Sequence, residues 1–341
     1  FTVGRMPPRQ KALLCICAVI LARVKLGSSF LINASLCQKN LRSALRATST
    51  AAADNLMVPA GILGPPEPLR SLKVGEHVNA FRALQYDDET ESIKFTIERV
   101  SSNPNIFRLR NFVTPSQCKQ IKSTAKESGM KEAETVTQDD SSSRKKCSVA
   151  WISSNGQEDK PSIVSDLVAS TANIFLSTDV KSHPSAGVED LQVLKYGTGG
   201  EFVHHHDGEP RILTVIYYIN GVGGTWFPLA HTTNDASEDF CEREPKNKAQ
   251  ALDMVRDLEP GKNGLLVKGD GLNEGANSTG GENEHIAWVN QGDAIAFFNY
   301  KDDGSAQLDW RSIHCGLPTT EEEETKWIAN HWYRLNVLAD M

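Results

Sequence analysis

The sequence predicts a mainly β domain, a sandwich or a barrel, with supporting helices on one side. From residue 191 onward, short segments rich in β-branched and aromatic residues follow one another, separated by Gly, Asn and Asp. Closely spaced strands with such turns are typical of sandwiches and barrels, whereas a doubly wound sheet alternates strands with helices. Two amphipathic patterns upstream, in TPSQCKQIKSTAKESGM and KPSIVSDLVASTANIFLS, predict the supporting helices.

Charge divides the 341-residue chain into a basic head and an acidic body. Residues 1–53 hold eight basic side chains and no Asp or Glu. The other 28 of the 36 basic residues stand against all 43 acidic residues in 54–341, a net charge of −15. A basic head on an acidic body indicates a targeting leader on a mature protein, and nothing in this charge favours nucleic-acid binding.

The head has the parts of a leader. Residues 12–22 form an eleven-residue apolar run between basic flanks, long enough for a signal-peptide core but short of the about 20 residues of a membrane span. The stretch SLCQKNLRSALRATSTAAA then has transit-peptide composition. We expect delivery to the secretory pathway, in the endoplasmic reticulum; the alternative is a plastid or other organelle reached through a two-part leader. Membrane association is expected only through the apolar run.

The body is expected to begin with a linker. Residues 54–90 are rich in Pro and Gly and lack periodicity, so we interpret them as a linker that leads into one domain at 91–341. A long polar insertion interrupts this domain at 229–290; its first part is expected to be partly helical and its Gly/Asn-rich second part flexible.

The chemistry is carried by EFVHHHDGEP, residues 201–210. Because side chains alternate faces along a strand, His205 and Asp207 point the same way. A third ligand has to come from a distant strand, and the candidate is His314 in RSIHCGLP. Two histidines and one carboxylate on one face of a metal are typical of non-haem Fe(II) oxygenases.

The motifs resemble those of Fe(II)/2-oxoglutarate dioxygenases of the prolyl 4-hydroxylase type, in the α-subunit catalytic domain. In KYGTGGEFVHHHD, Tyr196, Gly199, Phe202, His205 and Asp207 fall at the family's spacing. The segments RILTVIYYINGVGGTWFP, NQGDAIAFFN, IHCGLP and KWIANHWYR follow in the family's order. The resemblance spans about residues 105–336 and implies a double-stranded β-helix, or jelly roll.

The resemblance also implies roles for single residues. It assigns the metal to His205, Asp207 and His314, so that His204 and His206 are neighbours of the ligand. It places Lys326 against the far carboxylate of 2-oxoglutarate, because a dianion inside a barrel needs a buried cation. Tyr196 and Thr225 are expected to add hydroxyl groups to the same carboxylate.

The implied function is hydroxylation of prolyl residues in a peptide or protein, coupled to decarboxylation of 2-oxoglutarate to succinate. The implied cofactors are Fe(II), 2-oxoglutarate as co-substrate, and L-ascorbate to keep the iron reduced. The carboxylate of Asp207 favours hydroxylation over halogenation, since halogenating relatives carry a small residue there.

Two alternatives to prolyl hydroxylation stay open. The chain is then a dioxygenase that acts on a small molecule or a non-prolyl side chain, or a catalytically silent jelly-roll binding module. The second is kept because the loop between His314 and Lys326, enlarged by TTEEEET, is longer than expected for the family.

Overall fold

The computed structural model describes residues 63–83, 92–133, 144–154, 162–233, 244–269, 285–320 and 325–336. The predicted leader, residues 1–53, lies outside these ranges, so its targeting role stays a prediction. Within the described ranges, no helix combines the length and the hydropathy that crossing a membrane requires.

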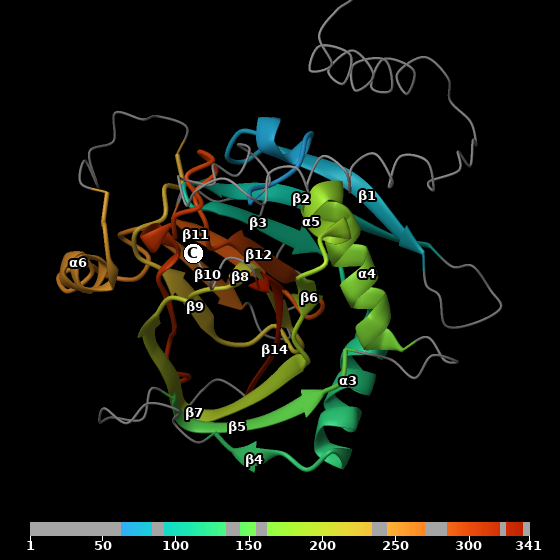
Figure 1. Cartoon of the computed structure of the whole chain (residues 1–341). Helices are drawn as coiled ribbons and strands as arrows, with labels where there is room; N and C mark the ends of the chain where they lie inside the picture. The colour runs from blue at the N-terminus through green and yellow to red at the C-terminus, as the bar shows by residue number, and fades with distance from the viewer. Residues whose placement is uncertain are drawn as a thin grey trace, which may run out of the picture. The chain divides into compact units, whose positions relative to one another are not determined.

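Strands are the most frequent regular structure in the described chain, and they join into one strongly curled sheet (Figure 1). The strands are β1 (His77–Ala83), β2 (Ser92–Ser102), β3 (Asn105–Arg110), β4 (Lys131–Glu132), β5 (Arg144–Ile152), β6 (Ala186–Val188), β7 (Leu191–His205), β8 (Arg211–Tyr218), β9 (Gly224–Phe227), β10 (Leu265–Gly269), β11 (Ile286–Val289), β12 (Ala294–Phe298), β13 (His314–Gly316) and β14 (Lys326–Leu335).

Strand β7 belongs to two layers of this sheet. Its first half pairs with β14 and its second half with β13. One antiparallel layer therefore runs β12–β8–β14–β7, and the other runs β7–β13–β9–β10. Two four-stranded antiparallel layers that share bent strands are the architecture of a jelly roll. The predicted fold class, mainly β with supporting helices, is confirmed.

The glycines of KYGTGG let β7 pass from one layer to the other. Gly199 has φ +69°, a conformation that only glycine adopts without strain. A Cβ on Gly200 would lie 2.6 Å from the carbonyl oxygen of Gly197. Side chains at these positions would therefore oppose the bend, and the bend is what carries the end of β7 over to β13.

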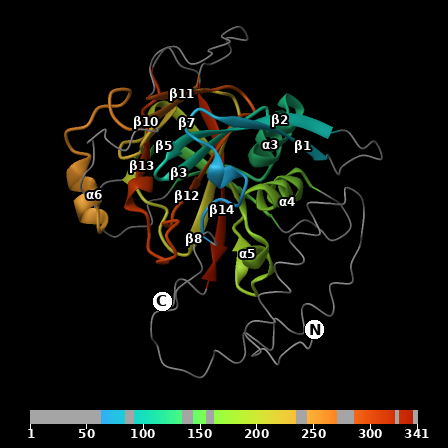
Figure 2. The ribbon, with the colours of Figure 1, turned by 90° about the horizontal axis from the view of Figure 1, so that it is seen from above.

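Both supporting helices that the sequence predicts are present among the described residues. They are α3 (Pro115–Glu127) and α4 (Ile163–Phe175), followed by the short helices α5 (Thr178–Ser182) and α6 (Lys248–Met254). Capping boxes start both long helices, with Thr114 and Gln117 at α3 and Ser162 and Ser165 at α4. Figures 1 and 2 show α3, α4 and α5 together on one side of the strands and α6 on the other.

Alternation along β14 separates the interior of the barrel from the helix-covered face. Ala329 and Tyr333 belong to the larger core cluster, which includes Leu167 and Phe175 of α4. Ile328 belongs to the second cluster, inside the barrel. By the period of two, Lys326, Asn330 and Trp332 face the same way as Ile328. One strand thus supplies a row of four side chains along the barrel interior.

The predicted linker at 54–90 is wrong over its described part, residues 63–83. Strand β1 pairs with β2 along its whole length, from His77 opposite Glu98 to Ala83 opposite Ser92. Arg82 is buried, forms an ion pair with Asp166 of α4, and donates to Gln117 of α3 and to the carbonyl oxygen of Phe112. Val78 and Ala80 pack against the core from the same face of β1 as Arg82, but the Pro- and Gly-rich composition around this short stripe concealed the strand.

The predicted insertion at 229–290 contains more regular structure than expected. Helix α6 lies in the part expected to be partly helical. Leu265–Gly269, expected to belong to a flexible stretch, forms β10 and pairs with both β9 and β11. The buried side chains of Leu265 and Val267 explain this, because they complete the interior cluster of the barrel. Residues 234–243 and 270–284 lie outside the described ranges.

Candidate active site

Cross-strand pairing brings the predicted metal ligands together. His205 ends β7, and His314 begins β13 directly opposite it. Asp207 follows two residues after His205, before the turn at Gly208, which has φ +73°. One potential ligand atom from each of the three residues lies within 4.8 Å of the others, a spacing that can hold one metal ion.

Hydrogen bonds leave one nitrogen of each histidine for a metal. The Nδ1 atoms of His205 and His314 lie 2.9 Å from the carbonyl oxygens of Val203 and Ser312. A carbonyl oxygen only accepts, so the proton sits on Nδ1 and the lone pair of Nε2 is left for the metal. Such outer hydrogen bonds fix the tautomer and orient the ring of a metal-binding histidine.

The carboxylate of Asp207 is held in its charged form. Burial acts to raise its pKa, but His314 and His205, together with the hydroxyl of Thr214, hold the pKa below its usual value. Thr214 donates to Oδ2 at 2.5 Å, and Oδ1 lies 3.9 Å from Nε2 of His205. Burial and the neighbouring His314 keep the pKa of His205 well below its usual value. A charged carboxylate beside a neutral imidazole of His205 is a state that can bind a divalent cation.

The other two histidines of the run have different surroundings. The ring of His204 packs edge-on against Trp226, with 5.4 Å between the ring centroids. Nδ1 of His206 accepts from the N–H of Gly208, so its Nε2 donates to the carbonyl oxygen of Asp309. Burial lowers the pKa of His206 to about 4. Only His205 faces Asp207 and His314 in the candidate metal cluster.

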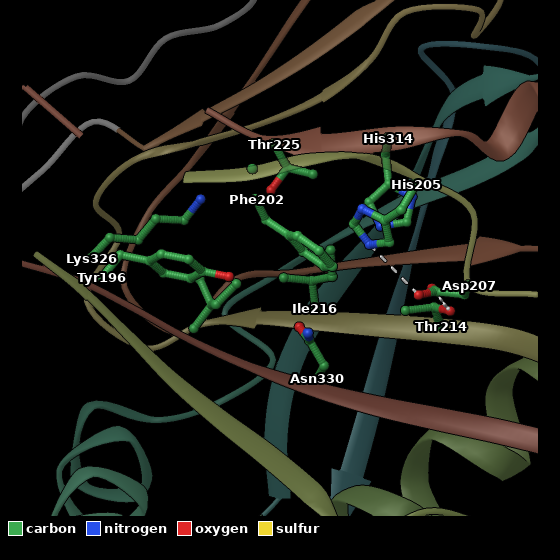
Figure 3. Close-up of a pocket in the computed structure, with 12 residues that line it drawn as sticks. Tyr196, Phe202, His205, Asp207, Thr214, Ile216, Thr225, His314, Lys326 and Asn330 are labelled. Atoms are coloured by element: carbon green, nitrogen blue, oxygen red, sulfur yellow. Dashed lines mark hydrogen bonds and ion pairs between the residues drawn. The ribbon is translucent and has the colours of Figure 1, made fainter. Parts of the chain in front are cut away.

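Lys326 lies at the other end of the same pocket (Figure 3). Its side chain is only 1% exposed, and its Nζ donates to the carbonyl oxygen of Gly224 at 2.7 Å. Gly223, at φ +85°, lies over the aliphatic stem, and a Cβ there would be 3.0 Å from Cγ of Lys326. The ring of Tyr196 lies 5.5 Å from Nζ. The long loop before Lys326 thus leaves the lysine in register, opposite Tyr196.

Thr225 contributes a hydroxyl to the pocket. Tyr218 donates to its Oγ1 at 2.9 Å, so the proton of Thr225 is available for an acceptor in the pocket. Burial raises the pKa of Tyr196, which therefore keeps its phenolic proton. The pocket has an empty volume of about 380 Å³ when the space open to solvent is included. With a cation at one end and metal ligands at the other, it fits a small dicarboxylate that also binds the metal.

The structure adds pocket residues that the sequence analysis did not single out for the site. They are Thr214, Ile216, Gly316, Ile328 and Asn330. Alternation along β8 and β14 could have found Thr214, Ile216, Ile328 and Asn330, since each lies two or four residues from a strand neighbour that faces the pocket. Phe202, known from the motif spacing, stacks on His205 with 3.7 Å between ring centroids.

An outer groove opens beside two of the candidate ligands, His205 and Asp207, and has an empty volume of about 860 Å³ when the space open to solvent is included. Trp151 and Trp332 line it, with 6.1 Å between their ring centroids. Arg211 pairs with Glu189 at 2.7 and 2.8 Å and stacks on Trp332. Trp332 is buried and forms part of the groove wall.

The chain is similar to known proteins over the candidate active site and over the residues around it. Residues 191–334 match the family model described as the 2OG-Fe(II) oxygenase superfamily. Prolyl 4-hydroxylase 2 of Arabidopsis thaliana is 28% identical over 257 residues, covering 70% of this chain and 70% of that protein. Probable prolyl 4-hydroxylase 4 of Arabidopsis thaliana has the same identity and coverage.

Among solved structures, the viral collagen prolyl hydroxylase vCPH from Paramecium Bursaria Chlorella virus-1, in its 2OG complex, is 16% identical to this chain. The match has a TM-score of 0.40 and covers 67% of this chain and 94% of that one. The matched range of the family model begins at β7 and ends within β14, so it contains His205, Asp207, His314 and Lys326.

Proposed function

Because residues 191–334 belong to the 2OG-Fe(II) oxygenase superfamily, we propose that this chain hydroxylates prolyl residues of a peptide or protein substrate. The chain is a 2-oxoglutarate-dependent dioxygenase, as the sequence predicts, and its curated relatives are named as prolyl 4-hydroxylases. This speaks against the alternative of a catalytically silent binding module.

One observation carries the chemical part of the proposal: three candidate metal ligands and a buried lysine share one pocket. His205, Asp207 and His314 hold Fe(II), and Lys326 pairs with the far carboxylate of 2-oxoglutarate, helped by Thr225 and Tyr196. Bound iron and co-substrate supply the oxidation that couples decarboxylation to hydroxylation. The chain fixes their orientation, and the apolar walls made by Ile216 and Ile328 limit the access of water.

The outer groove supports a prolyl substrate. Proline presents an apolar ring and no N–H, so an extended proline-rich chain is recognised mainly by aromatic walls. Trp151, 47% exposed, and the edge of Trp332 provide such walls next to His205 and Asp207. Ascorbate enters the proposal as the reductant that keeps the iron ferrous during turnover.

The test combines succinate formation with mass analysis of a proline-rich peptide, using the full chain, Fe(II), 2-oxoglutarate and ascorbate. We expect succinate and peptide that gains one oxygen per turnover, both lost in His205→Ala. Trp151→Ala is expected to raise the KM for peptide about tenfold, as for one aromatic contact. Phe81→Ala is the matched control, because Phe81 is also exposed, at 67%, and lines neither pocket.

Other outcomes separate the alternatives. Succinate formation that no proline-rich peptide stimulates, together with oxidation of a small molecule or of a non-prolyl side chain, contradicts the prolyl assignment and leaves the oxygenase in place. Equal KM values for the wild type and Trp151→Ala would remove the groove from peptide binding.

A further inference from the structure

A second groove lies beside the loop between β7 and β8, and the proposed roles do not use it. Helix α6, part of the 229–290 insertion, forms one wall, and residues 305–308 with Trp310 form another. The empty volume of this α6 groove is about 2230 Å³ when the space open to solvent is included. Most small-molecule sites have roughly 300–1,000 Å³, so the α6 groove has the size of a site for a length of peptide.

The α6 groove is fixed to the strand that carries a candidate metal ligand. Ala251 of α6 and Val255, the residue that follows the helix, pack with Leu229 and Ile313 in a small buried cluster. Ile313 immediately precedes His314, the first residue of β13, and Figure 2 shows α6 beside this strand. A wall anchored in this way keeps a constant position relative to the candidate metal cluster.

Two contacts connect the α6 groove with the outer groove. His206 lines the outer groove, and its ring centroid lies 4.8 Å from that of Trp310, which lines the α6 groove and is only partly buried. Glu209 also lines the α6 groove and follows the candidate ligand Asp207 by two residues. An extended chain that leaves the outer groove past His206 therefore meets the α6 groove next.

Two of the three carboxylates in the α6 groove are already paired. Glu244 pairs with Lys301 at 2.8 Å, and Asp253 pairs with Arg256 at 2.8 Å. Glu209 is exposed and forms no ion pair with any residue that the structure describes. It is therefore the acidic group of this groove that can bind a cation from a partner. The net charge of −15 on residues 54–341 also favours the approach of a basic partner.

The backbone limits how far this cation can lie from the target proline. Two residues span at most about 7 Å, so the Cα of Glu209 lies within about 7 Å of the Cα of Asp207. An extended proline-rich chain advances about 3.1 Å per residue. A lysine or arginine about two to four residues from the target proline can thus reach Glu209. Lys246, the unpaired cation of the groove among the described residues, lies just before α6 and not on the loop that follows Asp207.

We propose that the α6 groove is a substrate subsite: it binds the continuation of the peptide whose proline lies at the metal, with a lysine or arginine of that peptide paired to Glu209 and the chain lying against Trp310. The anchoring of α6 to β13 keeps the two grooves in register. This inference rests on the proposed function and adds a sequence preference to it.

The test compares a short proline-rich peptide with the same peptide extended on either side, carrying Lys or Glu two, three or four residues from the target proline. Hydroxylation by the full chain with Fe(II), 2-oxoglutarate and ascorbate is followed by mass analysis. At one position, Lys should give a kcat/KM about threefold to fivefold above Glu, as for one exposed charge pair, and high salt should reduce this ratio. Glu209→Lys should reverse the preference. Glu127→Lys is the control, because Glu127 is exposed and lines neither groove.

A steric pair of variants tests the wall that α6 forms. Gln250→Trp should fill the groove and remove the advantage in kcat/KM of the extended peptide over the short one. Leu252→Trp is the matched control, because Leu252 lies on the same helix, is 37% exposed and does not line the groove.

The outcomes separate the subsite from the reaction. Equal kcat/KM for Lys and Glu at every position in the wild type, or a preference for Lys that persists in Glu209→Lys, would overturn the subsite and leave the proposed function in place. A wild type that hydroxylates none of the peptides, while it forms succinate with another substrate, would instead contradict the proposed function itself.

Discussion

Lys326 shows how a single side chain in this pocket is held by its neighbours. A lysine in a barrel has many rotamers, and an ordered one has lost much of that freedom. Here Gly223 covers its stem, Gly224 accepts from its Nζ, and the ring of Tyr196 lies beside it. The lysine is therefore held in place without a ligand, which would lower the entropy cost of binding the proposed dicarboxylate.

Gly223→Ala tests this arrangement. The added Cβ would collide with the stem of Lys326 and would also impose strain at φ +85°. We expect the Kd for 2-oxoglutarate to rise about tenfold or more, with metal affinity little changed, as measured by calorimetry. Gly75→Ala is the control, because Gly75 has the same φ and nothing within 4 Å of its Cβ position. Equal losses of affinity in both variants would mean that strain alone explains the effect.

His331 gives a residue-level prediction on pH. Burial lowers its pKa to about 3, whereas in the unfolded chain the imidazole titrates near 6.5. Because the folded pKa is the lower one, its contribution to stability is fully present above about pH 6.5 and is lost as the pH falls towards 3. Its ring contacts Ser154 and the hydroxyl of Tyr217, both neutral.

The free energy of unfolding in urea should therefore fall below pH 6.5. In His331→Gln the slope of this free energy against pH should be smaller by up to about 1.4 kcal/mol per pH unit, which corresponds to the uptake of one proton. Exposed His77→Gln should leave the slope unchanged. Parallel slopes for His331→Gln and the wild type between pH 6 and 4 would show that this histidine does not contribute to acid sensitivity.

At the scale of the elements, β1 and the two long helices depend on one buried ion pair. Arg82 of β1 reaches Asp166 of α4 and Gln117 of α3, with both charged side chains at most 3% exposed. Removing one member of such a pair leaves a buried charge without a partner.

Arg82→Ala is expected to lower the free energy of unfolding by about 3–5 kcal/mol. The double variant Arg82→Met, Asp166→Leu should lose less of the free energy of unfolding than Arg82→Ala, because it leaves no unpaired charge. Arg256→Ala is the control, since its pair with Asp253 is exposed and is worth under about 1 kcal/mol. Urea denaturation checks all three. A double variant less stable than Arg82→Ala would contradict this account of the contact.

Some of the helices and strands could be predicted from sequence patterns, and others could not. Helices α3 and α4 were predictable from cap residues and apolar spacing, and β2 and β3 from alternation. Strand β1 was not, because its apolar face has only Val78 and Ala80 and continues into Arg82, whose partners are distant in the sequence. Strand β10 lies between Gly-rich segments, and turn residues there outweighed the short apolar run LLV.

At the scale of the whole molecule, the jelly roll explains why residues far apart in sequence form one site. A bent β7 joins both layers, so one strand presents Tyr196 at the Lys326 end of the pocket and His205 in the candidate metal cluster. The candidate ligands followed from the spacing of sequence motifs. The motifs did not identify Asn330 or the groove lined by Trp151 and Trp332, because these features depend on which strands lie side by side.

The central claim is that one pocket binds a metal through three side chains and 2-oxoglutarate through that metal and Lys326. Anaerobic calorimetry of 2-oxoglutarate binding to the Fe(II)-loaded full chain tests it most directly. We expect one molecule per chain, with binding abolished by a chelator and in His205→Ala, weakened in Lys326→Met, and retained in His204→Ala. Binding that persists without metal or in His205→Ala, or an Fe(II)-loaded wild type that binds no 2-oxoglutarate, would contradict the account.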